Sequence, residues 1–174
     1  HRYLGIIDDP LFLAELINSN GLRRVAELGV WKGRTFLHLL RATHATVIGV
    51  DAWRKRPENE GLPGGETYAD WDMDGYELTV RMNAKPYGDR AQILKMDTHE
   101  AAQQIEDGSL DLVFIDADHS EAGVRRDIAD WSPKVRAGGW ITGHDIDWPT
   151  VRRVVEERFG AYQVGPDNVW AVQT

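Results

Sequence analysis

Two short stretches far apart in the sequence carry residues that could do chemistry together. Residues 25–33 predict an apolar strand that carries Glu27 near its end, turns at Gly29 and opens a helix at Gly33. Residues 112–119 predict a second apolar strand, whose far end carries carboxylates and an imidazole. Because parallel strands point their carboxyl ends at one edge of a sheet, the glycine turn and the acidic group would face one crevice. That crevice is where such folds bind ligands.

The order of the expected elements predicts how these stretches are positioned. After a first helix that begins at Asp8-Asp9-Pro10 and stops at Gly21, strand and helix patterns alternate along the chain. Such alternation is typical of a Rossmann-like α/β fold, a doubly wound, mostly parallel sheet with helices on both faces. The tail predicts an antiparallel closing hairpin around a Gly-Pro-Asp turn. Strands are expected at 23–28, 46–51, 91–96, 110–116 and 139–144, helices at 33–42, 74–85, 98–105, 120–131 and 149–159, and the hairpin strands at 161–164 and 168–172.

The bulk properties of the chain limit its partners. The length of 174 residues fits one domain over residues 1–174, and the absence of cysteine excludes disulfides and thiolate metal sites. The net charge of -8 disfavours nucleic acid as a partner, because surfaces that bind nucleic acid are basic. No apolar run approaches the roughly 18 residues that a membrane span needs, so we expect a cytoplasmic protein with no membrane partner. A homo-oligomer is compatible with this sequence, and because the chain begins at His1 we expect an N-terminal element to be missing.

Residues 53–72 interrupt the alternation of strands and helices. They contain five glycine or proline residues and three aromatic residues. A long loop in a compact domain is usually a lid or a disordered segment, and the aromatic side chains favour a lid.

The glycine turn predicts a ligand with an adenosine but no phosphates. A dinucleotide-binding turn needs a G-x-G-x-x-G pattern so that the backbone can approach a pyrophosphate. Here Val30 and Trp31 follow Gly29, and a bulky side chain at the middle position obstructs a pyrophosphate. The pattern E-x-G-x-x-x-G suits instead an adenosine compound held beside a carboxylate.

At these residues the chain resembles the class I S-adenosylmethionine-dependent methyltransferases over nearly its whole length. Residues 27–33 match the first motif of that family, whose glycine loop curves around the methionine part of the cofactor. The resemblance implies that Asp51 grips both ribose hydroxyls, as a carboxylate with two acceptor oxygens can. It also implies that Asp97 and Thr98 read the adenine amino group. Ala52 and Trp53 adjoin Asp51, and the Trp53 ring is placed either on the adenine or in the core or lid. Taken singly, these glycines and carboxylates are equally compatible with plain turns and loops.

Residues 114–120 and 137–145 are similar to one branch of that superfamily, which contains macrocin O-methyltransferase, cephalosporin hydroxylase-like proteins and, more distantly, catechol O-methyltransferase. The resemblance implies a divalent cation held by Asp116 after the fourth strand and by His144 with Asp145 after the fifth. It places Asp116 in the catalytic and cofactor-binding sets as well. Relatives usually have an acidic or amide residue where His144 stands, and imidazole is a poor ligand for Mg²⁺ but a good one for Mn²⁺, Fe²⁺ or Zn²⁺.

His119 is the expected general base. A cation that binds the acceptor hydroxyl orients it and lowers its pKa, and an imidazole three residues beyond Asp116 is placed to take the proton. In the alternative interpretation, Asp118 and His119 cap the helix over 120–131 and Asp145 only precedes the last helix.

Three functions compete. The leading hypothesis is an O-methyltransferase that uses S-adenosylmethionine and acts on a hydroxyl of a sugar, natural product or similar small molecule. The second is a non-haem iron oxygenase built from His119, His144 and a carboxylate, which would leave the cofactor motif without a purpose. The third is a nucleotide-binding module without catalysis.

Overall fold

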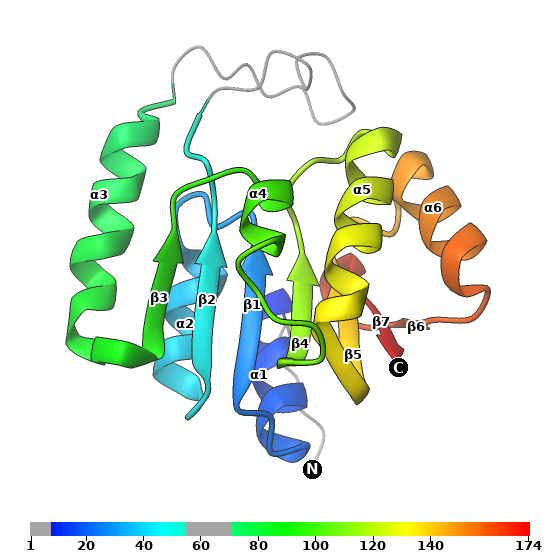
Figure 1. Cartoon of the computed structure of the whole chain (residues 1–174), viewed down its shortest axis with the longest axis horizontal. Coiled ribbons are helices and arrows are strands. Elements are labelled where there is room, and N and C mark those ends of the chain that lie inside the picture. Colours follow the sequence, from blue (N-terminus) through cyan, green and yellow to red (C-terminus); the bar gives the residue numbers. More distant parts are fainter. Residues whose placement is uncertain (1–7, 55–70) are drawn as a thin grey trace.

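The computed structural model describes residues 8–54 and 71–174, and its strands form one sheet (Figure 1). The strand order is β3-β2-β1-β4-β5-β7-β6, in which β3, β2, β1, β4 and β5 are parallel. The last two strands are antiparallel, so the predicted mostly parallel α/β sheet with a closing hairpin is confirmed. The strands are β1 (Arg24–Leu28), β2 (Thr46–Val50), β3 (Ala91–Leu94), β4 (Leu110–Ile115), β5 (Val135–Gly143), β6 (Gln163–Val164) and β7 (Trp170–Gln173).

Helices cover both faces of this sheet. In Figure 1, α4, α5 and α6 lie in front of the strands, and α1 and α2 lie behind them. No helix within residues 8–54 and 71–174 has the length and apolar character that a membrane span requires. The α-helices are α1 (Asp9–Ser19), α2 (Arg34–Ala42), α3 (Met73–Ala84), α4 (Thr98–Ala102), α5 (Glu121–Trp131) and α6 (Pro149–Phe159), with 3₁₀ segments η3 (Lys85–Arg90), η4 (Ser132–Lys134) and η5 (Pro166–Asn168).

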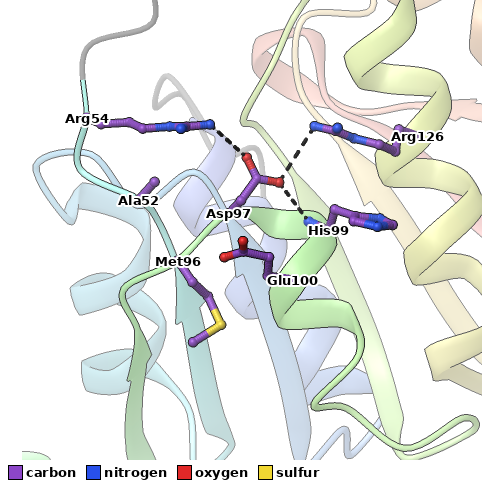
Figure 2. Close-up of a pocket in the computed structure, with 7 residues that line it drawn as sticks. All are labelled: Ala52, Arg54, Met96, Asp97, His99, Glu100 and Arg126. Atoms are coloured by element: carbon purple, nitrogen blue, oxygen red, sulfur yellow. Dashed lines mark hydrogen bonds and ion pairs between the residues drawn. The ribbon is translucent and has the colours of Figure 1, made fainter.

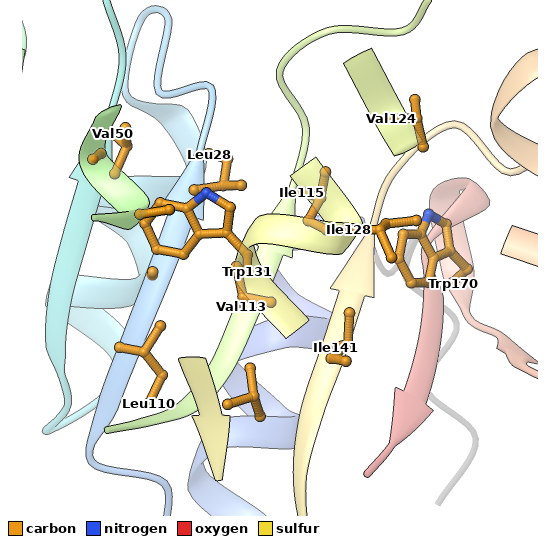
Figure 3. Close-up of a cluster of buried hydrophobic side chains, with 14 of the residues drawn as sticks. Leu28, Val50, Leu110, Val113, Ile115, Val124, Ile128, Trp131, Ile141 and Trp170 are labelled. Carbon is orange, nitrogen blue, oxygen red and sulfur yellow. The ribbon is translucent and has the colours of Figure 1, made fainter. Parts of the chain in front are cut away.

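Each face of the sheet has its own hydrophobic core. On the α4–α6 face, Trp131 and Trp170 are buried among aliphatic side chains of β1, β2, β4 and β5 (Figure 3). On the other face, Phe36 and Phe114 are fully buried between the sheet and α1, α2 and α3. Burial on both faces explains why the central strands are apolar throughout rather than alternating.

Backbone hydrogen bonds extend the sheet one residue beyond the strands, at the edge where the site was predicted. The N–H of Gly29 donates to the Val50 carbonyl over 2.9 Å, and the N–H of Asp116 donates to the Leu28 carbonyl over 2.9 Å. The N–H groups of Asp51 and His144 donate in the same way, to Leu94 and Ile115. The backbone of these four site residues is therefore fixed by the sheet itself.

Three sequence predictions need correction or fall outside the described residues. The fifth strand was expected from residue 139 but begins at Val135, because Gly138, with φ +75°, lies in an irregularity of the β4–β5 pairing instead of a turn. The helix expected over 98–105 ends at Ala102, after which the bonds become i to i+3 and the chain turns. The lid expected over 53–72 lies mostly outside the described residues.

The turn at Gly29 brings the two motif-bearing strands into contact. Its φ is +88°, and a Cβ added there would lie 2.0 Å from the Asp116 carbonyl oxygen. Only a glycine therefore lets the loop after β1 lie against the loop after β4.

We predict that Gly29→Ala destabilises the protein by about 2 to 5 kcal/mol, the sum of left-handed strain and a backbone overlap. Gly21→Ala is the matched control, because Gly21 has φ +62° but open space around its Cβ position. It should cost only the strain, about 1 to 2 kcal/mol. Urea unfolding of the two variants measures the difference, and equal losses would show that the contact with Asp116 is not tight.

Candidate active site

Glu27 places a buried carboxyl group beneath the glycine turn. The residue is 2% exposed, and its Oε2 has no hydrogen-bond partner among the described residues. Burial raises the pKa of Glu27 well above its usual range, and the negative charges of Asp116, Asp9 and Asp51 raise it further. Burial therefore favours the protonated form of this carboxyl group, and a donor or a cation close to it would favour the ionised form.

Asp51 is held by the two loops that flank it. One of its oxygens accepts the N–H of Trp31 over 2.8 Å, and the other accepts the N–H of Trp53 over 2.7 Å. Each carboxylate oxygen retains lone pairs for a further donor, as two ribose hydroxyls would require. Trp53 is 3% exposed and its Nε1 donates to the Trp31 carbonyl, so its ring is in the core, the second of the two placements expected for it.

A cavity of about 440 Å³ opens beside Ala52, the residue after Asp51, at the carboxyl ends of β2 and β3 (Figure 2). Asp97 projects into it, accepts the N–H of His99, and pairs with Arg54 at 3.2 Å and Arg126 at 3.6 Å. An adenine amino group at this position would share the Asp97 carboxylate with the two guanidinium groups. The lining residues are Ala52, Arg54, Met96, Asp97, His99, Glu100 and Arg126.

Thr98 faces away from this cavity. It is 3% exposed, and its hydroxyl donates to the Asp127 carboxylate over 2.5 Å. Its carbonyl accepts the indole N–H of Trp131, so Thr98 joins α4 to α5. Of the predicted pair, Asp97 is the side chain placed to meet a ligand.

The acidic group after β4 meets the end of β5, as the sequence predicted. The Nε2 of His119 lies 2.7 Å from the Asp145 carboxylate and 3.4 Å from that of Asp116. The Nδ1 of His144 lies 3.2 Å from Asp145 and 4.0 Å from Asp116. Asp145 has φ +56°, an uncommon conformation that turns its side chain toward both imidazoles.

His119 does not cap the helix that follows it. The N-cap of α5 is Ser120, whose side chain accepts the N–H of Gly123, and Asp118 accepts the N–H of Ser120. The His119 ring packs against Trp148, with the ring centroids 4.8 Å apart. The capping interpretation of His119 is therefore wrong, whereas Asp118 does order the turn into the helix.

The two carboxylates control the protonation of both imidazoles. Burial lowers the pKa of His119, but hydrogen bonds and charge from Asp116 and Asp145 outweigh burial and raise it to about 10. Burial also lowers the pKa of His144, but the carboxylates of Asp145, Asp116 and Asp9 outweigh burial and raise this pKa to about 9. Burial would raise the pKa of Asp145, but the two histidines hold it below its usual range. In this arrangement both rings are imidazolium ions at neutral pH.

A metal ion would replace that positive charge. One ligand atom from each of Asp116, His144 and Asp145 can be chosen so that all three lie within 4.8 Å of one another. One nitrogen and two carboxylate oxygens suit Mn²⁺ or a similar borderline cation. This group has one histidine and two carboxylates, whereas non-haem iron oxygenases use two histidines and one carboxylate.

Sequence reasoning missed two carboxylates near this cluster. Asp9 was assigned to a helix start, yet it is 4% exposed, bonds to Arg34 and Thr35, and contributes to the raised pKa of His144. Asp8 alone is enough to cap α1, so a second acidic residue beside it was the signal in the sequence that Asp9 has another role. Asp167 reads as a turn residue in sequence, but its carboxylate lies 3.9 Å from the Nε2 of His144.

The contact between aromatic rings beside the glycine turn was missed as well. Trp31 has φ +50°, and its ring lies 5.0 Å from that of Trp71 and 6.2 Å from that of Tyr76. The Lys32 ammonium lies over the Trp31 and Tyr76 rings. These rings give the loop after β1 an apolar surface that is partly exposed.

Solved structures of low sequence identity share this fold. The O-methyltransferase from Bacillus cereus in complex with SAH is 17% identical, with 95% of this chain and 80% of that chain covered and a TM-score of 0.64. The O-methyltransferase TomG from Streptomyces achromogenes, in complex with SAM, is 15% identical, with 95% and 79% covered and a TM-score of 0.63. The fold is thus the Rossmann-like fold of class I methyltransferases.

The family follows from the sequence match. Residues 26–146 match the model of a family described as a methyltransferase domain. An uncharacterized protein, y4gI, of Sinorhizobium fredii is 28% identical over 153 residues, which are 85% of this chain and 15% of that protein. The chain therefore spans a small part of the length of this curated relative. It belongs to the methyltransferase-domain family, and the resemblance seen in its motifs is confirmed.

The burial of Glu27 leads to a prediction about pH. Because its pKa in the folded protein is raised above 4.5, its contribution to stability is present below pH 4.5 and is lost as pH rises through the raised pKa. Glu27→Gln cannot ionise, so we expect it to be more stable than the wild type at pH 8, by about 1 to 3 kcal/mol. The gain should vanish near pH 4.5. Thermal unfolding of both proteins across this range measures it, and a difference that does not change with pH would contradict the assignment.

Proposed function

We propose that this protein is an S-adenosylmethionine-dependent O-methyltransferase that acts on a hydroxyl of a small molecule, such as a sugar or a natural product, with the help of a divalent cation. The observation that carries the proposal is the contact of Gly29 with the Asp116 backbone. It joins the half of the site suited to a nucleoside to the half suited to a cation. Membership of the methyltransferase family, and structural neighbours that hold SAM or SAH, support it.

The cofactor would occupy the edge formed by β1, β2 and β3. It supplies an electrophilic methyl group on a sulfonium ion. Asp51 would accept the ribose hydroxyls, and the cavity beside Asp97 would take the adenine. Glu27 would face the positively charged methionine part, which would stabilise the ionised carboxylate and lower its raised pKa.

Asp116, His144 and Asp145 would hold the divalent cation. A cation at these residues would orient the acceptor hydroxyl and lower its pKa. His119 would take the hydroxyl proton as the oxygen attacks the methyl carbon in line with the departing sulfur. His119 can act as a base only when a cation satisfies Asp116 and Asp145, because these carboxylates otherwise keep its pKa near 10.

The acceptor would approach over the aromatic group beside the glycine turn. Trp31, Trp71 and Tyr76 offer apolar rings, which small-molecule sites commonly use to hold a flat or ring-shaped ligand. The Lys32 ammonium would keep this surface positive at one end. These features support a ring-bearing acceptor rather than a short polar one.

The first test is cofactor binding. We expect the wild type to bind S-adenosylmethionine and its demethylated product in calorimetry and not to bind NAD. Asp51→Ala should weaken binding about 10- to 100-fold, as loss of hydrogen bonds to a charged group does.

Asp111→Ala is the matched control for that test. Asp111 also accepts two backbone N–H groups, from Arg23 and Arg24, but at the start of β4, the opposite edge of the sheet. It should lose stability without losing affinity. NAD binding, or equal affinity of the Asp51→Ala protein and the wild type, would overturn the proposed function.

The second test concerns the base. We expect His119→Ala to lower single-turnover methyl transfer by about 100- to 10,000-fold while still binding Mn²⁺, because His119 lies outside the proposed ligand set. Since the neutral imidazole is the active form, the wild-type rate should rise with pH through the imidazole pKa, and the variant should lose this rise. A folded variant that transfers methyl groups at the wild-type rate would exclude His119 as the base.

A further inference from the structure

The turn between β6 and β7 is fixed against the residues that follow β5. The N–H of Ile146 donates to the Asn168 carbonyl over 3.1 Å, which joins the turn to the residue after Asp145. Trp170 pairs with Gly143 in the sheet, and a Cβ on Gly143 would lie 2.5 Å from the Trp170 ring. The hairpin therefore has a defined position relative to His144.

The backbone of this turn is strained in a way that places one carboxylate. Asp167 and Asn168 have φ values of +53° and +59°, so two consecutive residues other than glycine are left-handed. A left-handed residue other than glycine is uncommon and persists where its surroundings hold it. The result is that the Asp167 carboxylate lies 3.9 Å from the Nε2 of His144.

The two nitrogens of His144 face different partners. Its Nδ1 is turned toward Asp145 and Asp116, the other members of the proposed cation site. Its Nε2 is buried and has no hydrogen-bond partner within residues 8–54 and 71–174. Asp9, also near His144, is already bound to Arg34 and Thr35. Asp167 is the carboxylate that ion-pairs with this nitrogen.

We propose that Asp167 is a positioning residue for the cation site: it accepts the Nε2–H of His144 and so directs the Nδ1 lone pair toward the cation. The inference rests on the cation site of the proposed function. Histidine ligands in proteins usually donate their other ring N–H to a carboxylate or carbonyl, which fixes the tautomer and the ring orientation. The Asp167 side chain is 44% exposed, so it has room to shorten the 3.9 Å separation to a hydrogen bond when the cation binds.

The chain offers a matched pair of variants to test this role. Asp167→Gly removes the carboxylate and relaxes a left-handed residue, whereas Asn168→Gly relaxes the neighbouring left-handed residue and keeps the carboxylate. We expect Asp167→Gly to weaken Mn²⁺ binding about 10- to 100-fold, the usual effect of removing such a partner. Asn168→Gly should bind Mn²⁺ as the wild type does. Asp167→Asn, which keeps an acceptor oxygen, should recover part of the affinity.

Two readouts separate positioning from a structural effect. Paramagnetic resonance of free Mn²⁺ gives the affinity, and ¹H and ¹⁵N resonances of the proteins loaded with diamagnetic Zn²⁺ report whether the Nε2–H of His144 is hydrogen-bonded. This Nε2–H proton should be protected from solvent exchange in the wild type and in Asn168→Gly, and it should lose this protection in Asp167→Gly. S-adenosylmethionine affinity, measured on the same samples, should be equal in all variants.

The outcomes are distinguishable from failure of the proposed function. Wild-type Mn²⁺ affinity in Asp167→Gly, equal losses in both glycine variants, or an Nε2–H proton of His144 that is equally protected in Asp167→Gly and the wild type would overturn the role of Asp167. A wild type that binds S-adenosylmethionine but no Mn²⁺ would overturn it as well and leave cofactor binding intact. Absence of both ligands would overturn the proposed function itself.

Discussion

The constraint on which this structure depends is the gathering of carboxylates at the carboxyl edge of one sheet. Five such groups lie close enough to influence one another or the same imidazoles, and they come from Asp9, Glu27, Asp51, Asp116 and Asp145. Burial, and then the mutual repulsion of these groups, raise the pKa values of Glu27 and Asp9. Arg34 and the two imidazolium rings compensate part of the charge. A site with this balance favours positively charged ligands, and a sulfonium cofactor and a divalent cation are both of that kind.

The fold produces this concentration through strands and their immediate ends. Gly29, Asp51, Asp116 and His144 each donate a backbone N–H that extends the sheet, so their positions follow from strand order. Elements outside the parallel core then complete the site. The start of α1 contributes Asp9, and the antiparallel hairpin contributes the turn that faces His144. Both ends of the described chain are thus coupled to the same few side chains.

The sequence predicted the parts of the site that obey local rules. Glu27, Gly29 and Asp51 lie at strand ends and turns, where the residue types themselves carry the signal, and the same is true of Asp116 and Asp145. By contrast, the partners that hold these residues come from remote parts of the chain. Arg54 follows β2 and Arg126 lies in α5, yet both pair with Asp97 at the start of α4, and no local pattern predicts such a meeting. Asp167 was missed because a Gly-Pro-Asp turn is explained by turn chemistry alone. Likewise, the fifth strand was expected only from residue 139, and the pairing of β4 with β5 reveals that Gly138 lies within it.

The central claim is that one crevice holds both a nucleoside cofactor and a divalent cation. Anomalous diffraction from crystals grown with S-adenosylhomocysteine and Mn²⁺ tests this claim directly. The account predicts a manganese peak among Asp116, His144 and Asp145, with the ribose on Asp51 and the adenine in the cavity beside Asp97. A nucleoside bound away from Asp51, or a fully occupied nucleoside with no manganese peak at these three residues, would contradict it.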